Sequence, residues 1–402
     1  MNLSEFSNSH QLQKIILTEI ERSRLQRITF AQFMATILYE QKYGYYNSGI
    51  VSIGSQGDFF TSSSLGKDFG ELLAIQFREM WHNLGCPDPF YLIEMGAGNG
   101  ELAQDILNFF TNSNEQNLIE AIRYVIVEQS PNLIEEQQQL LKSFTNFELT
   151  WKTWSDISSD SIEGCFFSNE LVDAFPVHLV TKIKNQLQEV YLSIQENKLT
   201  EIVEDISTEK LARYFDLINI DLLQPQYPEG YRSEVNLNAL DWITTIASKL
   251  KRGYVLTIDY GYTADKYYRP ARSQGTLQCY YQHRRHDNLY VNLGYQDLTA
   301  HVNFTALERQ GELFDLQTIA FTQQGLFLMA LGLGDRLNEL SSGKYNISEI
   351  FKRRDALHQL INPTGLGGFG VLIQGKNLNN KEQSLRGLSI PDGNLRRGVT
   401  YI

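Results

Sequence analysis

The chain has 402 residues, 42% of them hydrophobic and 20% charged, a composition typical of a globular protein and not of a disordered one. Lys and Arg number 35 against 47 Asp and Glu, and the resulting formal charge of -12 makes nucleic acid an unfavourable partner. No window approaches the ~18 consecutive apolar residues of a membrane span, and the first residues lack the features of a secretory signal. Cys86, Cys165 and Cys279 are widely spaced and odd in number. We therefore expect no disulfide framework, no metal site and a cytoplasmic location.

The first part of the chain predicts two helices separated by a long loop. Apolar residues recur at helical spacing between Ile28 and Glu40 and again between Phe69 and Gly85, where Pro87 reinforces the stop signal. The stretch 42–64 between them is rich in Gly, Ser and Tyr and predicts an ordered loop. We expect residues 1–85 to form a helical N-terminal extension.

From Pro89 onward, short apolar runs alternate with helical patterns. The runs lie at 90–95, 123–128, 147–151, 164–170 and 253–261, with helices predicted after the first and second runs and before the fifth. Ser130 is placed as the N-cap of the second of these helices, with Pro131 at its first position. This alternation predicts an α/β core with a parallel, doubly wound sheet, formed by residues 86–182 and 236–376.

The segment between the fourth and fifth runs has a different pattern. Apolar and polar residues alternate from 177 to 205, which predicts an antiparallel meander, and we expect residues 183–235 to form an inserted α+β lobe. The segment 262–301 is long, rich in aromatic residues and poor in helix or strand periodicity. The run 368–376 predicts a last strand, and we expect residues 377–402 to form a loose tail.

A glycine turn at the first strand–helix junction is the strongest local signal. Gly96, Gly98 and Gly100 follow Glu94 in a spacing that differs from the dinucleotide fingerprint, whose last glycine would stand at position 101. A carboxylate beside this turn would repel a pyrophosphate but suits a ligand with a cationic amino-acid end. The pattern Glu-x-Gly-x-Gly-x-Gly resembles that of class I methyltransferases, which bind S-adenosylmethionine, and this resemblance places Ala97 in the cofactor site with the glycines. A simple tight turn is the alternative.

A second carboxylate, Glu128, ends the second predicted strand. At that position an acid can accept hydrogen bonds from both hydroxyls of a ribose. The alternative is that Glu128 favours the start of the helix that begins near Pro131.

Further segments occur in an order that closely resembles the MidA family of S-adenosylmethionine-dependent methyltransferases. The segments are YGYY at 43–46, GDFFTS at 57–62, FGEL at 69–72, SNELVDAFPVH at 168–178, DYG at 259–261, GTL at 275–277, HRRH at 283–286 and QDLTAHVNF at 296–304. The resemblance covers about residues 28–373. It implies a Rossmann-like class I methyltransferase sheet, and a partner protein methylated on arginine, since the family's mitochondrial member dimethylates an arginine of a respiratory complex I subunit.

The resemblance and the chain order together suggest the substrate residues. Asn169, Glu170 and Asp173 follow the fourth strand, where carboxylates can hold a guanidinium by forked hydrogen bonds. The loop resembles the acidic substrate loop of protein arginine methyltransferases, with Asp173 as the second acid. The alternatives are that Asp173 caps a helix or turn and that Glu170 is only solvated.

Other residues of the motifs receive roles by the same resemblance. His301 could take a proton late in the reaction, or cap the helix that begins near Asn303. Asp58, Phe59 and Thr61 are expected to close over the cofactor, which makes residues 1–85 an extension with a cofactor-covering loop. His283–His286 lacks the spacing of a metal site and is expected on the solvated surface.

The sequence therefore predicts a methyltransferase that uses S-adenosylmethionine, with an arginine of a partner protein, such as a respiratory complex I type subunit, as acceptor. Two alternatives stay open. The enzyme could act on a small molecule or another side chain, or the chain could be a non-catalytic assembly factor that binds S-adenosylmethionine.

Overall fold

The computed structural model describes residues 3–49, 61–196, 198–281 and 284–389. The chain forms two compact units, each assembled from segments that are far apart in the sequence. The unit that we call the sheet unit comprises Phe60–Leu171, Thr244–Tyr260 and Gly311–Ile402. The unit that we call the N-terminal unit comprises Met1–Phe59, Val172–Ile243 and Gly261–Gln310.

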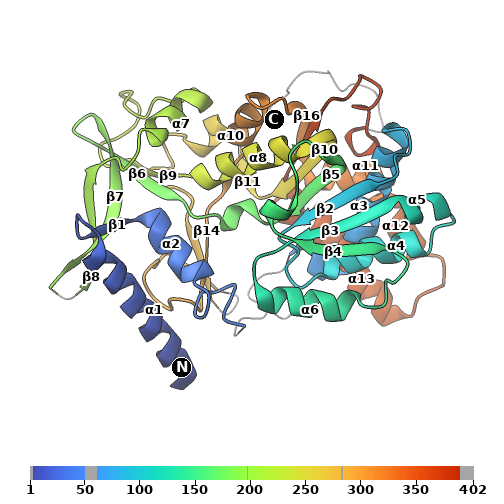
Figure 1. The fold of residues 1–402 in the computed structure, drawn as a ribbon, viewed down its shortest axis with the longest axis horizontal. Helices are drawn as coiled ribbons and strands as arrows, with labels where there is room; N and C mark the ends of the chain where they lie inside the picture. Colours follow the sequence, from blue (N-terminus) through green and yellow to red (C-terminus); the bar gives the residue numbers. More distant parts are fainter. Residues whose placement is uncertain (1–2, 50–60, 197, 282–283, 390–402) are drawn as a thin grey trace. The chain divides into compact units, whose positions relative to one another are not determined.

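The sheet unit is built on a seven-stranded sheet in the order β16-β17-β10-β5-β2-β3-β4 (Figure 1). Its strands are β2 (Phe90–Met95), β3 (Ile122–Val127), β4 (Glu148–Lys152), β5 (Ile162–Asn169), β10 (Leu250–Asp259), β16 (Gln317–Gln323) and β17 (Gly370–Lys376). The first five strands are parallel, whereas β17 runs antiparallel to both β10 and β16. The predicted doubly wound α/β sheet is therefore confirmed, with β16 as a strand that the sequence pattern missed.

The strand order places a ligand crevice. The chain adds β3 and β4 on one side of β2 and then returns to add β5 and β10 on the other side. Such a reversal leaves a crevice at the carboxyl ends of the two central strands, and ligands of open α/β sheets bind there. The glycine turn follows β2 and the acidic loop follows β5, so both lie at this edge of the sheet.

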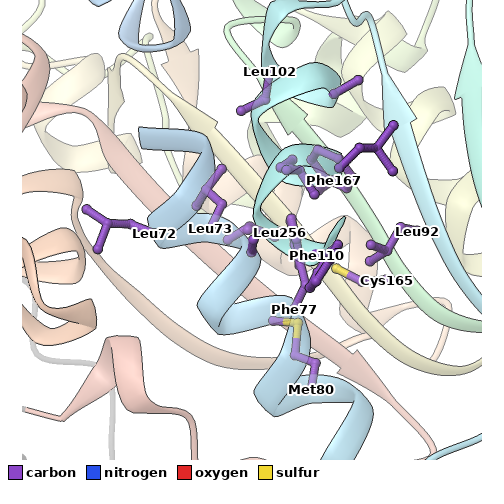
Figure 2. Close-up of a cluster of buried hydrophobic side chains, with 14 of the residues drawn as sticks. Leu72, Leu73, Phe77, Met80, Leu92, Leu102, Phe110, Cys165, Phe167 and Leu256 are labelled. Carbon is purple, nitrogen blue, oxygen red and sulfur yellow. The ribbon is translucent and has the colours of Figure 1, made fainter. Parts of the chain in front are cut away.

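The helices of the sheet unit bury apolar faces against the sheet. They are α3 (Asp68–Asn83), α4 (Glu101–Thr111), α5 (Gln116–Ala121), α6 (Pro131–Leu141), α11 (Gln324–Leu331), α12 (Leu333–Glu339) and α13 (Ile347–Ile361), with 3-10 turns η1 (Ser62–Leu65), η2 (Trp154–Asp156), η4 (Leu366–Gly368) and η5 (Arg386–Leu388). Figure 2 shows part of this core, where Phe77 of α3 lies against Phe167 of β5 with ring centroids 4.7 Å apart. Phe110 of α4 is fully buried in the same cluster. The sheet and its helices thus hold the loops at the strand ends in fixed positions.

The N-terminal unit contains a separate antiparallel sheet and smaller elements. The sheet has the order β1-β7-β6-β9, with β8 also paired to β7; the strands are β1 (Arg27–Thr29), β6 (His178–Ile183), β7 (Gln186–Gln195), β8 (Lys198–Asp205) and β9 (Arg232–Val235). Its other elements are α1 (Leu3–Arg22), α2 (Phe30–Tyr39), η3 (Val172–Ala174), α7 (Lys210–Ile218), α9 (Ala264–Tyr267), α10 (Phe304–Glu312), and the short strands β11 (Gly261–Tyr262), β12 (Gln278–Tyr281), β13 (Arg284–His286), β14 (Asp297–Thr299) and β15 (Val302–Asn303). The antiparallel meander is confirmed. The chain then passes to the sheet unit through α8 (Leu237–Lys249).

The compact units divide the chain differently from the predicted segments. Helix α3 was expected within the extension 1–85, but its apolar face belongs to the core of the sheet unit. Strand β1 pairs with β7, so the residues expected as an inserted lobe share one sheet with the N-terminal segment. Residues 261–310 belong to this unit and not to the sheet core. The start of the expected loose tail is packed, because Leu385 is buried in the core of the sheet unit; residues 390–402 lie outside the described residues.

No helix within the described ranges is long and apolar enough to cross a membrane. The same ranges contain no group of three or more His, Cys, Asp or Glu side chains that could hold a metal ion.

Candidate active site

The glycine turn between β2 and α4 adopts a backbone conformation that side chains oppose. Gly96, Gly98 and Gly100 have φ angles of 71°, 54° and 89°, all in the left-handed region that glycine adopts at little cost. A Cβ atom on Gly96 would lie 2.6 Å from Cδ1 of Leu171, so the Leu171 side chain would have to shift to make room for it. The turn is closed by a hydrogen bond from Gly100 N to Ala97 O of 2.9 Å. The predicted strand, turn and helix are present as expected.

Glu94 is a buried carboxylate at the end of β2. Only 2% of the residue is exposed, and its Oε2 accepts a 2.7 Å hydrogen bond from the hydroxyl of Tyr124 on β3. The pKa of Glu94 is raised to about 7, mainly by burial and to a smaller extent by the charge of Glu128, whereas the Tyr124 hydrogen bond opposes the rise. A cation next to this carboxylate would replace the lost hydration and favour the ionised form. The site is therefore suited to a positively charged ligand group.

Glu128 lies directly after β3. Its Oε1 accepts hydrogen bonds from the backbone N of Gln129 at 2.7 Å and of Ser130 at 2.9 Å. Burial raises the pKa of Glu128, although these two bonds and a hydrogen bond from the Gln137 side chain lower it. Ser130 caps α6 as predicted, accepting from Leu133 N. The two backbone bonds hold the Glu128 carboxylate beside the start of α6, which agrees with the alternative that Glu128 favours the start of this helix. The ribose-binding role stays a prediction.

Asn169, the last residue of β5, and Glu170, which follows it, present two polar side chains at the same edge of the sheet. Oε1 of Glu170 accepts from Asn169 Nδ2 and from the backbone N of Ser62, each at 3.0 Å. Glu170 is held at a φ of 53°, a conformation that is unfavourable for a residue with a side chain. The expectation that Glu170 could be merely solvated is wrong, because both contacts hold its carboxylate in place.

Asn169 carries a buried acceptor. Within the part of the chain that the structure describes, its Oδ1 is buried and has no hydrogen-bond partner. The orientation of this amide is fixed by chemistry, since only Nδ2 can donate to the Glu170 carboxylate. A buried oxygen without a partner costs free energy that a ligand N–H would recover. This atom is the clearest sign of a missing ligand donor at the edge of the sheet.

Of the remaining predicted residues, Asp173 and His301 belong to the N-terminal unit and Thr61 belongs to the sheet unit. Asp173 is buried within η3, and its backbone carbonyl accepts from Ala300 N at 3.0 Å. Of the covering loop, Thr61 is described and its hydroxyl pairs with that of Ser63 at 3.1 Å. Asp58 and Phe59 lie outside the described residues.

His301 is held between polar and aromatic neighbours of the N-terminal unit. Its ring stacks on Tyr262 with centroids 5.0 Å apart and planes 5° apart, and the Arg272 guanidinium lies 4.2 Å from the Tyr262 centroid. Burial, and then the charge of Arg272, lower the pKa of His301 to about 4. The imidazole is therefore neutral at neutral pH, the state that a proton acceptor requires.

Three residues of the site in the sheet unit were missed by sequence reasoning: Ser62, Tyr124 and Gln137. Ser62 lies in a family segment, but its backbone contact with Glu170 joins positions 108 residues apart. Tyr124 stands opposite Leu92 in the register of β2 and β3, so it shares a face with Glu94, and only that register reveals the contact. Gln137 had no signal beyond its place on a helix.

Comparison with known proteins identifies the family. A family model for S-adenosyl-L-methionine-dependent methyltransferases matches residues 72–322. The chain belongs to the MidA family of these methyltransferases.

Relatives and solved structures agree with this assignment. The human mitochondrial protein arginine methyltransferase NDUFAF7 is 28% identical over 364 residues, which cover 85% of this chain and 78% of that protein. Its Drosophila melanogaster homologue is 28% identical over 336 residues, covering 78% and 73%. A crystal structure from Burkholderia thailandensis with bound S-adenosyl-homocysteine superposes with a TM-score of 0.84 at 26% identity, covering 97% of both chains.

The site residues fit S-adenosylmethionine, the cofactor of this MidA-family enzyme. The buried carboxylate of Glu94 suits the ammonium group of this cofactor. Two backbone N–H groups hold the carboxylate of Glu128 directly after β3. A pyrophosphate would meet Glu94 near the end of β2 and Glu101 in the first turn of α4, so this edge of the sheet disfavours it.

Proposed function

We propose that this methyltransferase transfers a methyl group to a guanidinium nitrogen of an arginine in a partner protein. The observation that carries the proposal is the polar pair after β5, where the buried Asn169 Oδ1 lacks a donor and the Glu170 carboxylate is held beside it. Both groups accept hydrogen bonds, and a guanidinium with its five N–H donors can bond to both of them at once, whereas a hydroxyl has a single donor. The names of the relatives, which describe protein arginine methyltransferases, support the same acceptor.

The chain's contribution to the reaction is placement and electrostatics. S-adenosylmethionine supplies an electrophilic methyl group on a sulfonium. Glu94 would hold its ammonium end and Glu128 its ribose, with the glycine turn beneath. Orienting the two reactants in this way can lower a barrier by ~7–11 kcal/mol.

Arginine is cationic at all ordinary pH values, so the site has to make one of its nitrogens nucleophilic. A carboxylate that accepts N–H bonds from the guanidinium draws the positive charge toward itself and leaves more electron density on the remaining nitrogen. We propose Glu170 for this role, with Asp173 as the second acid three positions along the chain. The neutral His301 is proposed as the acceptor of the proton that the nitrogen releases.

The experiment is transfer of tritium from labelled S-adenosylmethionine in a lysate of a strain that lacks this protein. A purified respiratory complex I type subunit is the first individual acceptor to assay. We expect label in a protein band that yields methylated arginine on acid hydrolysis and mass spectrometry. Label in a small molecule or in another amino acid would contradict the arginine acceptor. No transfer by a protein that binds S-adenosylmethionine normally would favour a non-catalytic assembly role.

A further inference from the structure

We propose that Gln137 is a positioning residue of the cofactor site, which holds the glycine turn and Glu128 in the arrangement that binds S-adenosylmethionine. Gln137 lies on α6 and is fully buried. Glutamine side chains are mostly exposed in proteins, so its burial calls for hydrogen-bond partners. Its side chain bonds to Gly98 of the glycine turn, to Trp151 of β4 and to Glu128 after β3. All three partners lie outside α6.

The two ends of the Gln137 amide have different partners. Nε2 donates to the backbone carbonyl of Gly98 at 2.7 Å, and Oε1 accepts from the indole Nε1 of Trp151 on β4 at 2.8 Å. An indole N–H only donates and a carbonyl only accepts, so a single orientation of the amide satisfies both. The side chain is thereby locked, and it ties the turn after β2 to the fourth parallel strand.

The same side chain reaches the predicted ribose acid. A hydrogen bond from Gln137 to the Glu128 carboxylate helps to keep it ionised against the effect of burial. Gln137 therefore connects the glycine turn with the acid that follows β3. One amide thus links the glycine turn with the acid that would hold the ribose.

The glycine turn needs such an external constraint. Gly98 stands between two other glycines with positive φ, and its peptide groups have no side chain of their own to fix their orientation. A bond to the Gly98 carbonyl fixes that peptide plane before the ligand arrives, so binding does not have to order it. Loss of the bond is expected to weaken ligand binding more than it weakens the fold.

The test compares three variants by calorimetric titration with S-adenosylmethionine at temperatures where circular dichroism shows each to be folded. Gln137→Met keeps the volume but loses both bonds, and we expect its Kd to rise about tenfold. Trp151→Phe leaves the buried Oε1 of Gln137 without its donor but keeps the bond from Gln137 to Gly98. Its Kd should therefore stay within about threefold of wild type. Equal weakening in both variants, or none in Gln137→Met, would overturn the proposal.

Gln137→Glu, the third variant, gives a readout that a purely structural role would not move. When the introduced carboxyl group is protonated, it can still donate to Gly98 O and accept from Trp151, whereas its ionised form loses the donor and repels Glu128. We therefore expect the ratio of variant to wild-type Kd to fall toward one as the pH decreases from about 8 to about 5.5. A ratio that is constant across this range would contradict the proposal, even if the other variants fail to fold.

Discussion

The raised pKa of Glu94 makes cofactor binding depend on pH in a direction that the structure fixes. With a pKa of about 7, the carboxylate loses its charge as the pH falls through neutrality. Only the ionised form attracts an ammonium group, so affinity should decrease toward lower pH. Glu94→Gln keeps the shape and can still accept from Tyr124, but it carries no charge at any pH. The variant should bind more weakly above pH 7 and lose the part of the pH dependence that Glu94 causes.

The size of the effect follows from the ionised fraction of Glu94. For a pKa of about 7, roughly three quarters of the carboxylate is ionised at pH 7.5 and about 3% at pH 5.5. If only the ionised form binds, the apparent Kd rises by up to about 25-fold between these pH values, or ~2 kcal/mol. Tyr124→Phe removes the hydrogen bond that opposes the rise in pKa, so it should move the midpoint to higher pH.

The assay is calorimetric titration with S-adenosylhomocysteine, which retains the ammonium group and forms a stable complex. Because Glu128 also has a raised pKa, the comparison with Glu94→Gln isolates the contribution of Glu94. A Kd that changes with pH identically in wild type and Glu94→Gln would refute the assignment of Glu94 to the ammonium group.

The stability of the ligand-free protein provides an independent check with a definite sign. The folded pKa of about 7 exceeds the ordinary value of 4.5, so between these pH values the folded state keeps a proton that the unfolded chain has lost. Stability therefore falls as the pH rises through this window and levels off above it, by about 3 kcal/mol in total. Glu94→Gln should be more stable than wild type at pH 8 by up to that amount in chemical denaturation. Equal or lower stability would contradict a buried charge at this position.

Four further substitutions have defined outcomes. Gly98→Val should abolish S-adenosylmethionine binding, because a β-branched residue opposes the left-handed backbone of the turn; calorimetry on the folded variant measures it. Glu170→Ala and Asp173→Ala should retain S-adenosylmethionine binding but lose methyl transfer in the tritium assay. Gly275→Ala should lower the free energy of unfolding by about 2–4 kcal/mol in denaturant titrations, because its Cβ would lie 2.0 Å from Oε1 of the buried Glu234 at a φ of 74°.

Matched controls separate these effects from general damage. Gly343→Ala has a φ of 76° but nothing within 4 Å of the added Cβ, so it should cost only about 1 kcal/mol. If Gly275→Ala lowers the free energy of unfolding by no more than Gly343→Ala does, the contact with Glu234 is unimportant. Unchanged affinity in Gly98→Val would remove the turn from the cofactor site, and full transfer by both acid variants would remove the guanidinium clamp.

The sequence predicts the parts of the site that rest on local patterns. The strand, turn and helix around Gly98, and the cap at Ser130, follow from residue types whose backbone preferences act over a few positions. The parallel order of the main strands follows from their alternation with helices. These features needed no knowledge of distant contacts.

The sequence does not predict the features that depend on register and on distant segments. The Tyr124 contact with Glu94 depends on how β2 and β3 align, and the contact of Ser62 with Glu170 joins segments 108 residues apart. The strand β16 is half-buried and ends in polar residues, so its apolar pattern is weak. The bounds of the two units could not be read from the sequence for the same reason, because β1 pairs with β7, more than 150 residues further along the chain.

The most direct test is a crystal structure of this protein grown with S-adenosylhomocysteine in the presence of excess NAD. The account predicts density for S-adenosylhomocysteine over the turn at Gly96–Gly100, with its ammonium group bonded to Glu94 and its ribose hydroxyls to Glu128. A turn occupied by NAD, or S-adenosylhomocysteine bound away from both carboxylates, would contradict it.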